Sequence, residues 1–245
     1  MKIVAIIPSR YASSRFPGKP LAIINGKFMV QWVYERVSQN QNISEVYVAT
    51  DDERIFNAVE SFGGKALMTS DKHSCGTDRL AECVSLLGLE ENDIVLNIQG
   101  DEPLVQPEMV DDLIACFKNA DTYMGTLKKR IESEEELNNP NVVKVISDCN
   151  DNAIYFSRFC LPYERDNTRV VHYKHIGMYG YTADFLLRFS KMARTPLEIA
   201  ESLEQLRVIE NGYKIKIKET NYLTIGVDTP EQVKQVEKIM RNADA

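Results

Sequence analysis

The chain has 245 residues, of which 44% are hydrophobic and 27% charged, so it is long enough for one large α/β domain and has the composition of an ordinary globular protein. Its formal net charge of -7 argues against general attraction to nucleic acid or to an anionic membrane, because both select for a basic surface. Any bound anion must therefore be held locally.

The first ten residues contain one short apolar run, which ends at Pro8 and is too short for a secretory signal or a membrane span. We find no later apolar run of membrane-spanning length. The five cysteines are scattered and odd in number, which indicates reduced thiols rather than a disulfide framework or a zinc site. We therefore expect a cytoplasmic protein that has neither a nucleic-acid nor a membrane partner.

In the first half of the chain, apolar runs of strand length alternate with segments of helical period, which favours parallel strands joined by helices. The run at 93–99 is apolar on both faces, as a central parallel strand requires. Strands are expected over 2–8, 45–50 and 93–99, and helices around 30–37 and over 52–62, 77–87 and 107–118.

After about residue 121 the rhythm changes, because strand-like segments follow one another with only a short acidic helix at 132–137 between them. This grouping predicts an antiparallel arm, inserted at about 121–190, that leaves the main sheet and returns to it. Later segments predict a helix over 197–211 that ends at Gly212, a strand over 213–219 and a last helix over 230–241.

Neither a repeat nor a Pro/Ser linker divides the chain. We therefore expect one α/β domain over 1–245, with a mostly parallel central sheet, helices on both faces and the inserted antiparallel arm.

The loop SRYASSRFPGK follows the first strand and carries Arg10, Arg15 and Lys19 among small residues. Ligands of open α/β sheets bind at the carboxyl ends of the strands, where this loop begins. Small residues let backbone N–H groups approach a ligand, and the cations favour a polyphosphate. The loop matches neither GxxxxGK[ST] nor GxGxxG, which indicates a mononucleotide loop of another kind. A solvated basic turn is the alternative.

Two aspartates stand where strands end: Asp101 in NIQGDEP and Asp228 in TIGVDTP. An unpaired carboxylate is costly there unless it is solvated or bound to a cation. Mg²⁺ needs few carboxylates when phosphates supply its other ligands. Asp228 could instead cap the helix that follows. Beside a cationic loop, the pair favours a metal-phosphate site.

Further polar residues are more ambiguous. Arg79 lies in a first helical turn, where a cation opposes the helix dipole, so its position indicates a role other than helix stability. His175, Tyr179 and Tyr181 alternate on one strand face, which an ordinary half-buried strand also explains.

Glu204 and Gln205 are expected on the helix over 197–211, where a solvated helix face is the alternative reading. Arg158 stands in an apolar strand, and if it is buried it needs an acidic partner or a ligand.

The segments IIPSRYASSRFPGKPL, HSCGTDRLAE, LNIQGDEPLV, HIGMYGY, SLEQLR and GVDTPE occur in the order found in the CMP-Kdo synthetases. The chain resembles this family of acidic-sugar cytidylyltransferases from residue 1 to about residue 241. The resemblance implies a Rossmann-like nucleotidyltransferase fold, Mg²⁺ as cofactor and a homodimer that uses the inserted arm. It also implies transfer of CMP from CTP to the anomeric hydroxyl of 3-deoxy-D-manno-octulosonate (Kdo), with release of pyrophosphate, for lipopolysaccharide or capsule synthesis.

The resemblance also implies roles for single residues. Those implied in nucleotide binding are Arg10, Ser14, Arg15, Lys19, Ser74 and Arg79. Those implied in sugar binding are Gln99, Arg158, His175, Tyr179, Glu204 and Gln205. Asp101 and Asp228 are the implied metal ligands, and together with Arg10 and Lys19 they are the implied catalytic residues.

The chain departs from the family pattern at Lys174 and at Thr182, where arginine is usual, and the segment over 163–173 is shorter. These departures lie on the sugar side, so another 2-keto acid, such as 8-amino-Kdo or a sialic-type acid, is an alternative acceptor. A regulator that binds CTP without catalysis is a further alternative. The presence of both Asp101 and Asp228 favours an enzyme, because a sensor has no need to orient a nucleophile.

Overall fold

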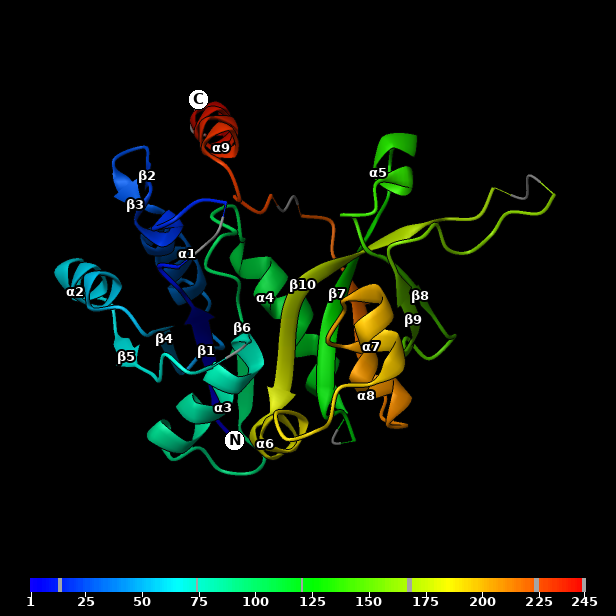
Figure 1. Ribbon diagram of the computed structural model, residues 1–245, viewed down its shortest axis with the longest axis horizontal. Helices are drawn as coiled ribbons and strands as arrows, with labels where there is room; N and C mark the ends of the chain where they lie inside the picture. Colours follow the sequence, from blue (N-terminus) through cyan, green and yellow to red (C-terminus); the bar gives the residue numbers. More distant parts are fainter. Residues whose placement is uncertain (13–14, 74, 120, 167–168, 223–224, 244–245) are drawn as a thin grey trace.

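The computed structural model describes residues 1–12, 15–73, 75–119, 121–166, 169–222 and 225–243. Its centre is a sheet whose strands run in the order β11-β7-β10-β6-β1-β4-β5 (Figure 1). Strand β1 (Ile3–Pro8) lies between β4 (Glu45–Thr50) and β6 (Ile94–Asn97) and is parallel to both. Strand β5 (Ala66–Met68) extends this parallel half beyond β4.

The other half of the sheet contains the strand that runs against the rest. This strand, β10 (Tyr173–Thr182), is antiparallel to both β6 and β7 (Met124–Arg130). The edge strand β11 (Lys216–Glu219) is parallel to β7. The sheet is therefore mostly parallel, as the sequence predicts.

Two smaller antiparallel pairs lie off this path. Strands β8 (Lys144–Ser147) and β9 (Ala153–Ser157) form a hairpin that joins the main sheet through β10. The segment between β9 and β10 extends away from the body of the molecule (Figure 1). Strands β2 (Ile23–Ile24) and β3 (Lys27–Phe28) form a separate two-stranded sheet.

Helices cover both faces of the sheet, because strand side chains alternate between two apolar clusters. In β1, Val4 and Ile6 face one cluster, whereas Ala5 and Ile7 face the other. The first face is covered by α3 (Gly76–Leu87), α6 (Ala183–Phe189) and α8 (Leu206–Glu210). The second is covered by α1 (Met29–Ser38), α2 (Glu53–Ser61) and α4 (Pro107–Ile114). The expected α/β architecture is confirmed.

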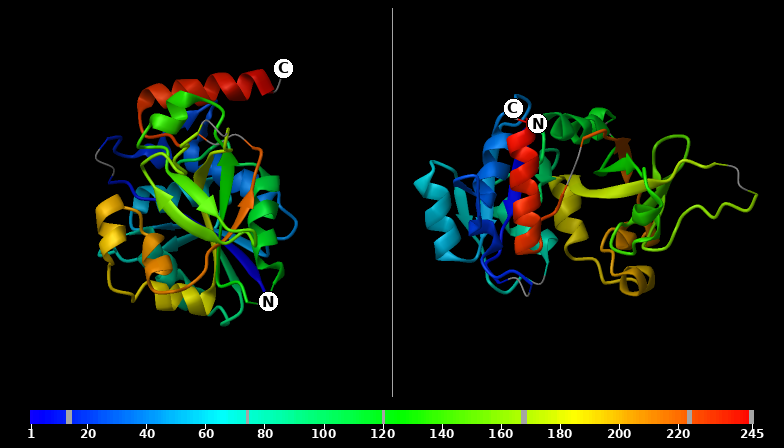
Figure 2. Two further views of the ribbon diagram at one scale, coloured as in Figure 1. Left: turned by 90° about the vertical axis from the view of Figure 1, so that its right-hand side faces the viewer. Right: turned by 90° about the horizontal axis from the view of Figure 1, so that it is seen from above.

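A third apolar cluster fastens the last helix, α9 (Pro230–Ala243), to the rest. Val236 and Met240 of α9 pack with Ile24 of β2 and Met29 of α1. Figure 2 shows α9, in red, beside this blue N-terminal part of the chain. The remaining helices are short: α5 (Glu134–Asn138), α7 (Pro196–Glu201) and the 3-10 turns η1 (Lys19–Leu21) and η2 (Ala115–Lys118).

Strand 45–50 and the helix after it match their predictions closely, because local signals define both. The Asp52 side chain accepts a hydrogen bond from the Arg54 amide and so caps α2. The predicted helix over 107–118 tightens after Ile114 into the 3-10 turn η2. The sequence analysis did not predict α6.

The prediction of one helix over 197–211 is wrong. The chain turns at Ser202, whose φ of 53° is left-handed, and forms the separate helices α7 and α8. Glu204 and Gln205 lie in the turn before α8 rather than on a helix face. The turn lets the buried residues Glu198 and Arg207 form an ion pair while Leu206 enters the core.

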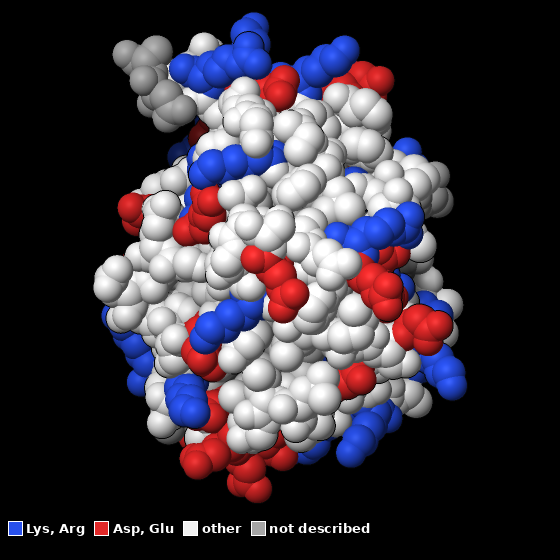
Figure 3. All heavy atoms as spheres, turned by 90° about the vertical axis from the view of Figure 1, so that its left-hand side faces the viewer, with Lys and Arg blue, Asp and Glu red and all other residues white. Residues whose placement is uncertain are grey.

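Among the described residues, the helices include none that combines the length and apolar content needed to cross a bilayer. On the face shown in Figure 3, acidic and basic side chains are interspersed. The described part of this face therefore offers no extended basic surface to an anion, and an anion site requires a local group of cations.

Close packing of β7 against η2 gives a first prediction. A Cβ atom at Gly125 would lie 2.6 Å from Cβ of Cys116, an atom that cannot rotate away. We expect Gly125→Ala to lower the free energy of unfolding by about 1–3 kcal/mol, measured by urea denaturation. Gly177→Ala in β10 is the matched control, because no atom lies within 4 Å of its added Cβ. Equal losses in the two variants would contradict this account.

Candidate active site

The carboxyl ends of β1 and β6 open into a hollow of about 470 Å³, at the edge of the sheet where α/β proteins bind ligands. The loop after β1 forms one wall, and the segment after β6 forms another. The polar and charged residues that line this hollow include Arg10, Arg15, Lys19, Gln99, Asp101 and Asp228. We call it the nucleotide hollow, because this is where the sequence predicts the polyphosphate loop.

Lys19 links the two walls. Its Nζ donates hydrogen bonds to Oδ2 of Asp101 and, over 3.0 Å, to Oδ1 of Asp228. Burial alone would lower the pKa of Lys19, but the charge of Asp101 and the bonds to both carboxylates outweigh it and raise that pKa. Lys19 therefore remains protonated at neutral pH.

Arg15 adds a second cation, 2.8 Å from Oδ2 of Asp228, and its side chain is 68% exposed. The left-handed conformation of Gly18, with φ of 72°, turns the loop back. The amide of Gly18 donates to the carbonyl of Tyr11, which closes this turn.

Asp228 is directed at these cations because another residue caps α9. Oε1 of Gln232 accepts hydrogen bonds from the amides of Asp228, at 2.7 Å, and Thr229, at 3.0 Å. The Asp228 carboxylate is thus available to Lys19 and Arg15. The Val227 amide also donates to the carbonyl of Asp101, so the two aspartates are joined through the backbone. Sequence reasoning missed Gln232, although a glutamine at the third helical position is a capping signal.

The two carboxylates have the chemistry of a small magnesium site. They converge on one ammonium group, and they present hard oxygen donors beside cations suited to phosphate. The described part of the chain contains no group of three or more His, Cys, Asp or Glu placed to hold a metal ion. Two carboxylates are nevertheless sufficient for Mg²⁺ when substrate phosphates and water complete its coordination, so the residues present fit this ion.

Arg10 is positioned from the opposite wall. Its guanidinium donates to the carbonyls of His73, at 2.5 Å, and Cys75, at 3.3 Å, just before α3. The side chain thus lines the nucleotide hollow, and within the described part of the chain it forms no ion pair with a carboxylate. Ser14 and Ser74, also predicted to bind nucleotide, lie outside the described residues.

A second hollow, of about 180 Å³, adjoins the first and shares Pro8, Gly76 and Gln99 with it. Its walls include the aromatic residues Tyr179, Tyr181 and Phe189 and the polar residues Asn97, Glu204 and Gln205. We call it the acceptor hollow. The structure thus brings together Gln99, Tyr179, Glu204 and Gln205, as the sequence predicts for a sugar site.

Glu204 is held from two sides. The hydroxyl of Thr77 in α3 donates to its Oε2 at 2.6 Å, and the guanidinium of Arg207 lies 3.5 Å from its Oε1. Arg207 is anchored by the carboxylate of Glu198, at 2.5 and 2.7 Å. The side-chain bond to Arg207 lowers the pKa of Glu198 despite its burial. Sequence reasoning missed Arg207, a cation within the apolar stripe of α8.

The cytidylyltransferase family profile matches residues 4–217. The chain belongs to this family. A 3-deoxy-manno-octulosonate cytidylyltransferase of Fusobacterium nucleatum is 54% identical over 96% of each chain. One of Geobacter metallireducens is also 54% identical, over 98% of this chain and 99% of that protein. An 8-amino-3,8-dideoxy-manno-octulosonate cytidylyltransferase of Shewanella pealeana is 50% identical over 96% of each chain.

A solved structure supports the same grouping. CMP:2-keto-3-deoxy-manno-octonic acid synthetase complexed with CTP has a TM-score of 0.94 and 42% sequence identity over 99% of this chain and 100% of that one. The resemblance to the CMP-Kdo synthetases is thereby confirmed. A putative glucose-1-phosphate thymidylyltransferase of Bacillus anthracis, with a TM-score of 0.69 and 16% identity, shares the fold alone.

In this cytidylyltransferase, Arg79 faces the interior. Its guanidinium is fully buried, lies 2.7 Å from Oδ2 of Asp51 and also bonds the Thr69 hydroxyl. This pair ties the first turn of α3 to the end of β4, which explains a cation where the helix dipole disfavours one. Arg79 lines neither of the two hollows among their described residues. Its nucleotide contact stays a prediction.

Two predicted sugar-binding residues also lie apart from the acceptor hollow. The His175 ring packs 5.2 Å from that of Tyr179, and its Nε2 lies 3.0 Å from the Thr126 hydroxyl. Burial lowers the pKa of His175 to about 3, so the ring is neutral at physiological pH. Arg158 donates to the carbonyls of Glu201, at 2.8 Å, and Pro140, at 3.0 Å. His175 thus packs against the ring of Tyr179. Arg158, which follows β9, connects the β8–β9 hairpin to α7 through Glu201.

The Asp51–Arg79 pair gives a second prediction. Removing one partner leaves a buried charge uncompensated, so Asp51→Asn should lower the free energy of unfolding by about 3 kcal/mol in urea denaturation. Asp184→Asn is the matched control, because its partner Arg188 is 46% exposed and Asp184 itself 44%. That control should cost less than about 1 kcal/mol. A loss from Asp51→Asn no larger than that of the control would contradict an anchoring role.

Proposed function

We propose that this enzyme transfers CMP from CTP to the anomeric hydroxyl of Kdo and releases pyrophosphate. One observation carries the proposal. The cations Lys19 and Arg15 and the carboxylates Asp101 and Asp228 converge in one hollow, and Gln99 connects it to a second hollow suited to a sugar. The names of the Fusobacterium and Geobacter relatives support the choice of Kdo.

CTP is the expected nucleotide, because the synthetase of similar structure was solved in complex with it. Arg10, Arg15 and Lys19 surround the place where its triphosphate would bind. Guanidinium and ammonium groups form charge-assisted hydrogen bonds with phosphate oxygens. These bonds would also release the carboxylates from their present pairing with Lys19 and Arg15.

Mg²⁺ is the expected cofactor, and Asp101 and Asp228 would hold it. When bound it would supply a Lewis acid that neutralises phosphate charge and makes the acceptor hydroxyl easier to deprotonate. Lys19 would then turn its positive charge from the carboxylates to the phosphates.

The reaction needs no covalent intermediate on the protein. The anomeric oxygen of the sugar forms a bond to the α-phosphorus, the bond from that phosphorus to the bridging oxygen breaks, and pyrophosphate leaves with the electron pair. The hydroxyl proton is released. The task of the protein is to orient both substrates and to stabilise the charge that grows on the leaving group. Arg10, Arg15 and Lys19 supply that positive charge.

An 8-amino-substituted Kdo is a second candidate acceptor. The Shewanella relative is named for it, and the Glu204 carboxylate in the acceptor hollow could pair with an ammonium group. The two residues that depart from the family pattern, Lys174 and Thr182, do not favour either sugar. Lys174 pairs with Glu136, and the Thr182 side chain caps α6. Neither residue lines the described part of the acceptor hollow.

We also propose a homodimer formed through the arm. Large apolar side chains are exposed there, including Phe159 at 78%, Tyr163 at 84% and Ile154 at 51%. Exposed apolar groups that cluster on an extended segment are typical of an association surface. The cysteines of the described chain are free thiols, which suits a cytoplasmic enzyme of lipopolysaccharide or capsule synthesis.

The third prediction concerns catalysis. The enzyme should release pyrophosphate only when CTP, a sugar acid and Mg²⁺ are all present, and Kdo should give the highest kcat/KM in a panel with 8-amino-Kdo and a sialic acid. Asp101→Asn should lower kcat on the order of 10³-fold, because a metal ligand contributes several kcal/mol to the transition state.

The control is Asp121→Asn, the same change at an exposed position outside both hollows, which should keep full activity. Absence of pyrophosphate release with every sugar acid would overturn the proposed function. Preference for 8-amino-Kdo would establish the second candidate instead.

The fourth prediction concerns assembly. Light scattering should give the mass of two chains for the unmodified protein, and Phe159→Ser combined with Tyr163→Ser should shift it to the mass of one. Ile23→Ser, at a position 52% exposed outside the arm, serves as the control and should leave the dimer intact. A single-chain mass for the unmodified protein would refute the dimer.

A further inference from the structure

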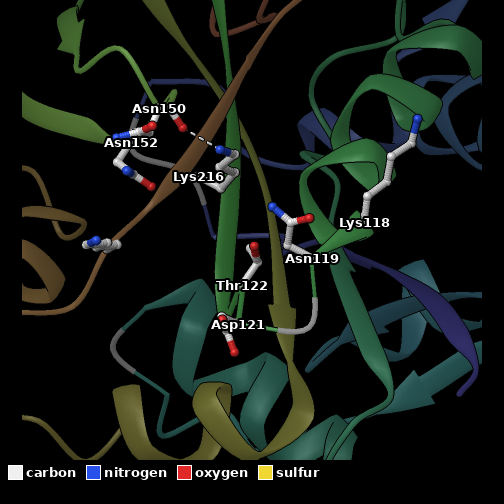
Figure 4. A pocket seen from close by; sticks show the side chains of 8 residues that line it. Lys118, Asn119, Asp121, Thr122, Asn150, Asn152 and Lys216 are labelled. Atoms are coloured by element: carbon white, nitrogen blue, oxygen red, sulfur yellow. Dashed lines mark hydrogen bonds between the residues drawn. The ribbon is translucent and has the colours of Figure 1, made fainter.

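The described part of the molecule contains other recesses besides the two hollows. One of about 540 Å³ lies where β7 and β11 begin and the β8–β9 turn ends, and it is lined by lysine, asparagine, aspartate and threonine (Figure 4). Lys216 bonds the Asn150 carbonyl, and Lys118 points away from the other side chains. None of its described lining residues is buried. Water therefore satisfies these groups, and nothing there requires a ligand.

The acceptor hollow differs, because it contains buried polar atoms without a partner. Asn97 is 5% exposed and its Oδ1 has no hydrogen-bond partner, and Gln205 is 4% exposed with an unpartnered Nε2. A buried polar atom without a hydrogen bond is unfavourable, because it has lost its hydration and gained no partner. The recess thus contains one hydrogen-bond acceptor, Oδ1 of Asn97, and one donor, Nε2 of Gln205, that lack partners. This indicates that a bound ligand supplies the missing hydrogen bonds.

The fold determines which atom of Asn97 is available. Asn97 is the last residue of β6 and pairs in register with Tyr179 of β10. Asn97 and Tyr181 both line the acceptor hollow, and the contact between their side chains offsets part of the rise in the Tyr181 pKa that burial causes. The amide oxygen is left as a free acceptor lining the hollow.

The other lining groups define the class of ligand. Glu204 presents a carboxylate, and the described lining residues include no lysine or arginine. A ligand carboxylate would be repelled here, whereas hydroxyl groups could donate to both Asn97 and Glu204. The rings of Tyr179, Tyr181 and Phe189 offer an apolar surface to the C–H groups of a sugar. The hollow therefore suits the polyol end of a sugar acid.

We infer that the amide oxygen of Asn97 accepts a hydrogen bond from a hydroxyl of the acceptor's polyol chain, and that Asn97 is a specificity-determining residue of the acceptor hollow. This inference rests on the proposed function and goes beyond it, because the sequence analysis assigned no role to Asn97. The acid end of the sugar then faces the cationic nucleotide hollow across the shared residue Gln99.

The fifth prediction tests this contact. Asn97→Leu keeps the side-chain volume and removes the amide oxygen that accepts the hydrogen bond. It should raise KM for Kdo about 10- to 100-fold, equivalent to about 1.4–2.8 kcal/mol, and leave KM for CTP within about twofold. Asn97→Ala is a second variant with the same expected direction should the leucine variant fail to fold. Asn119→Leu, in the recess of Figure 4, is the matched control and should behave as the unmodified enzyme.

Acceptor analogues separate a binding role from a structural one. For the analogue that lacks the contacted hydroxyl, Asn97→Leu should lose no further affinity, since the bond is already absent, whereas analogues lacking other hydroxyls should keep the full penalty. Tyr181→Phe leaves the Asn97 oxygen in place and should raise KM for Kdo less than Asn97→Leu does.

Turnover of Kdo by the unmodified enzyme tests the proposed function independently of the inference. If that turnover is present, an unchanged KM in Asn97→Leu, or an equal penalty for every analogue, overturns the role of Asn97. If no sugar acid is turned over or bound, the proposed function fails and the inference fails with it.

Discussion

One ammonium group between two carboxylates is the interaction on which the active site depends. Lys19, Asp101 and Asp228 come from three separate parts of the chain, and each would be unfavourable at the rim of the sheet without the others. Their mutual attraction holds the loop after β1 against the ends of β6 and α9. In the proposed reaction the same charges would be redistributed to phosphates and a divalent cation, so the interaction that orders the free site would also prepare it for its ligands.

The surrounding hydrogen bonds direct these charges into the hollow. Gln232 caps α9 and so frees the Asp228 carboxylate from that task, while backbone carbonyls before α3 hold Arg10. Positioning by neutral groups has a physical advantage. It orients the charged atoms without neutralising them, so Arg10 keeps its attraction for an anion and Asp228 keeps its attraction for cations.

The two hollows differ in charge, as the two ligands proposed for them do. The nucleotide hollow collects cations, whereas the acceptor hollow combines aromatic rings, amides and one carboxylate. Gln99, Pro8 and Gly76 line both hollows and so form the boundary between them, which is where the proposed reaction would bring a sugar hydroxyl to the α-phosphate. Buried Glu198 forms an ion pair with Arg207, and Arg207 in turn contacts Glu204. These contacts fix the position of the Glu204 side chain in the wall of the acceptor hollow.

The sequence by itself determined the parallel strands, the charged loop and the family, because these depend on patterns within short segments: apolar runs, the cap at Asp52 and ordered motifs. Only the tertiary structure decided which charged residues line the two hollows. Arg79 is turned inward by Asp51, and the buried pair of Glu198 and Arg207 divides a predicted helix at Ser202. The amide oxygen of Asn97 is left without a partner in a recess that it lines together with Tyr179 and Tyr181, more than 80 residues further on. Such outcomes depend on partners distant in sequence, so no local pattern contains them.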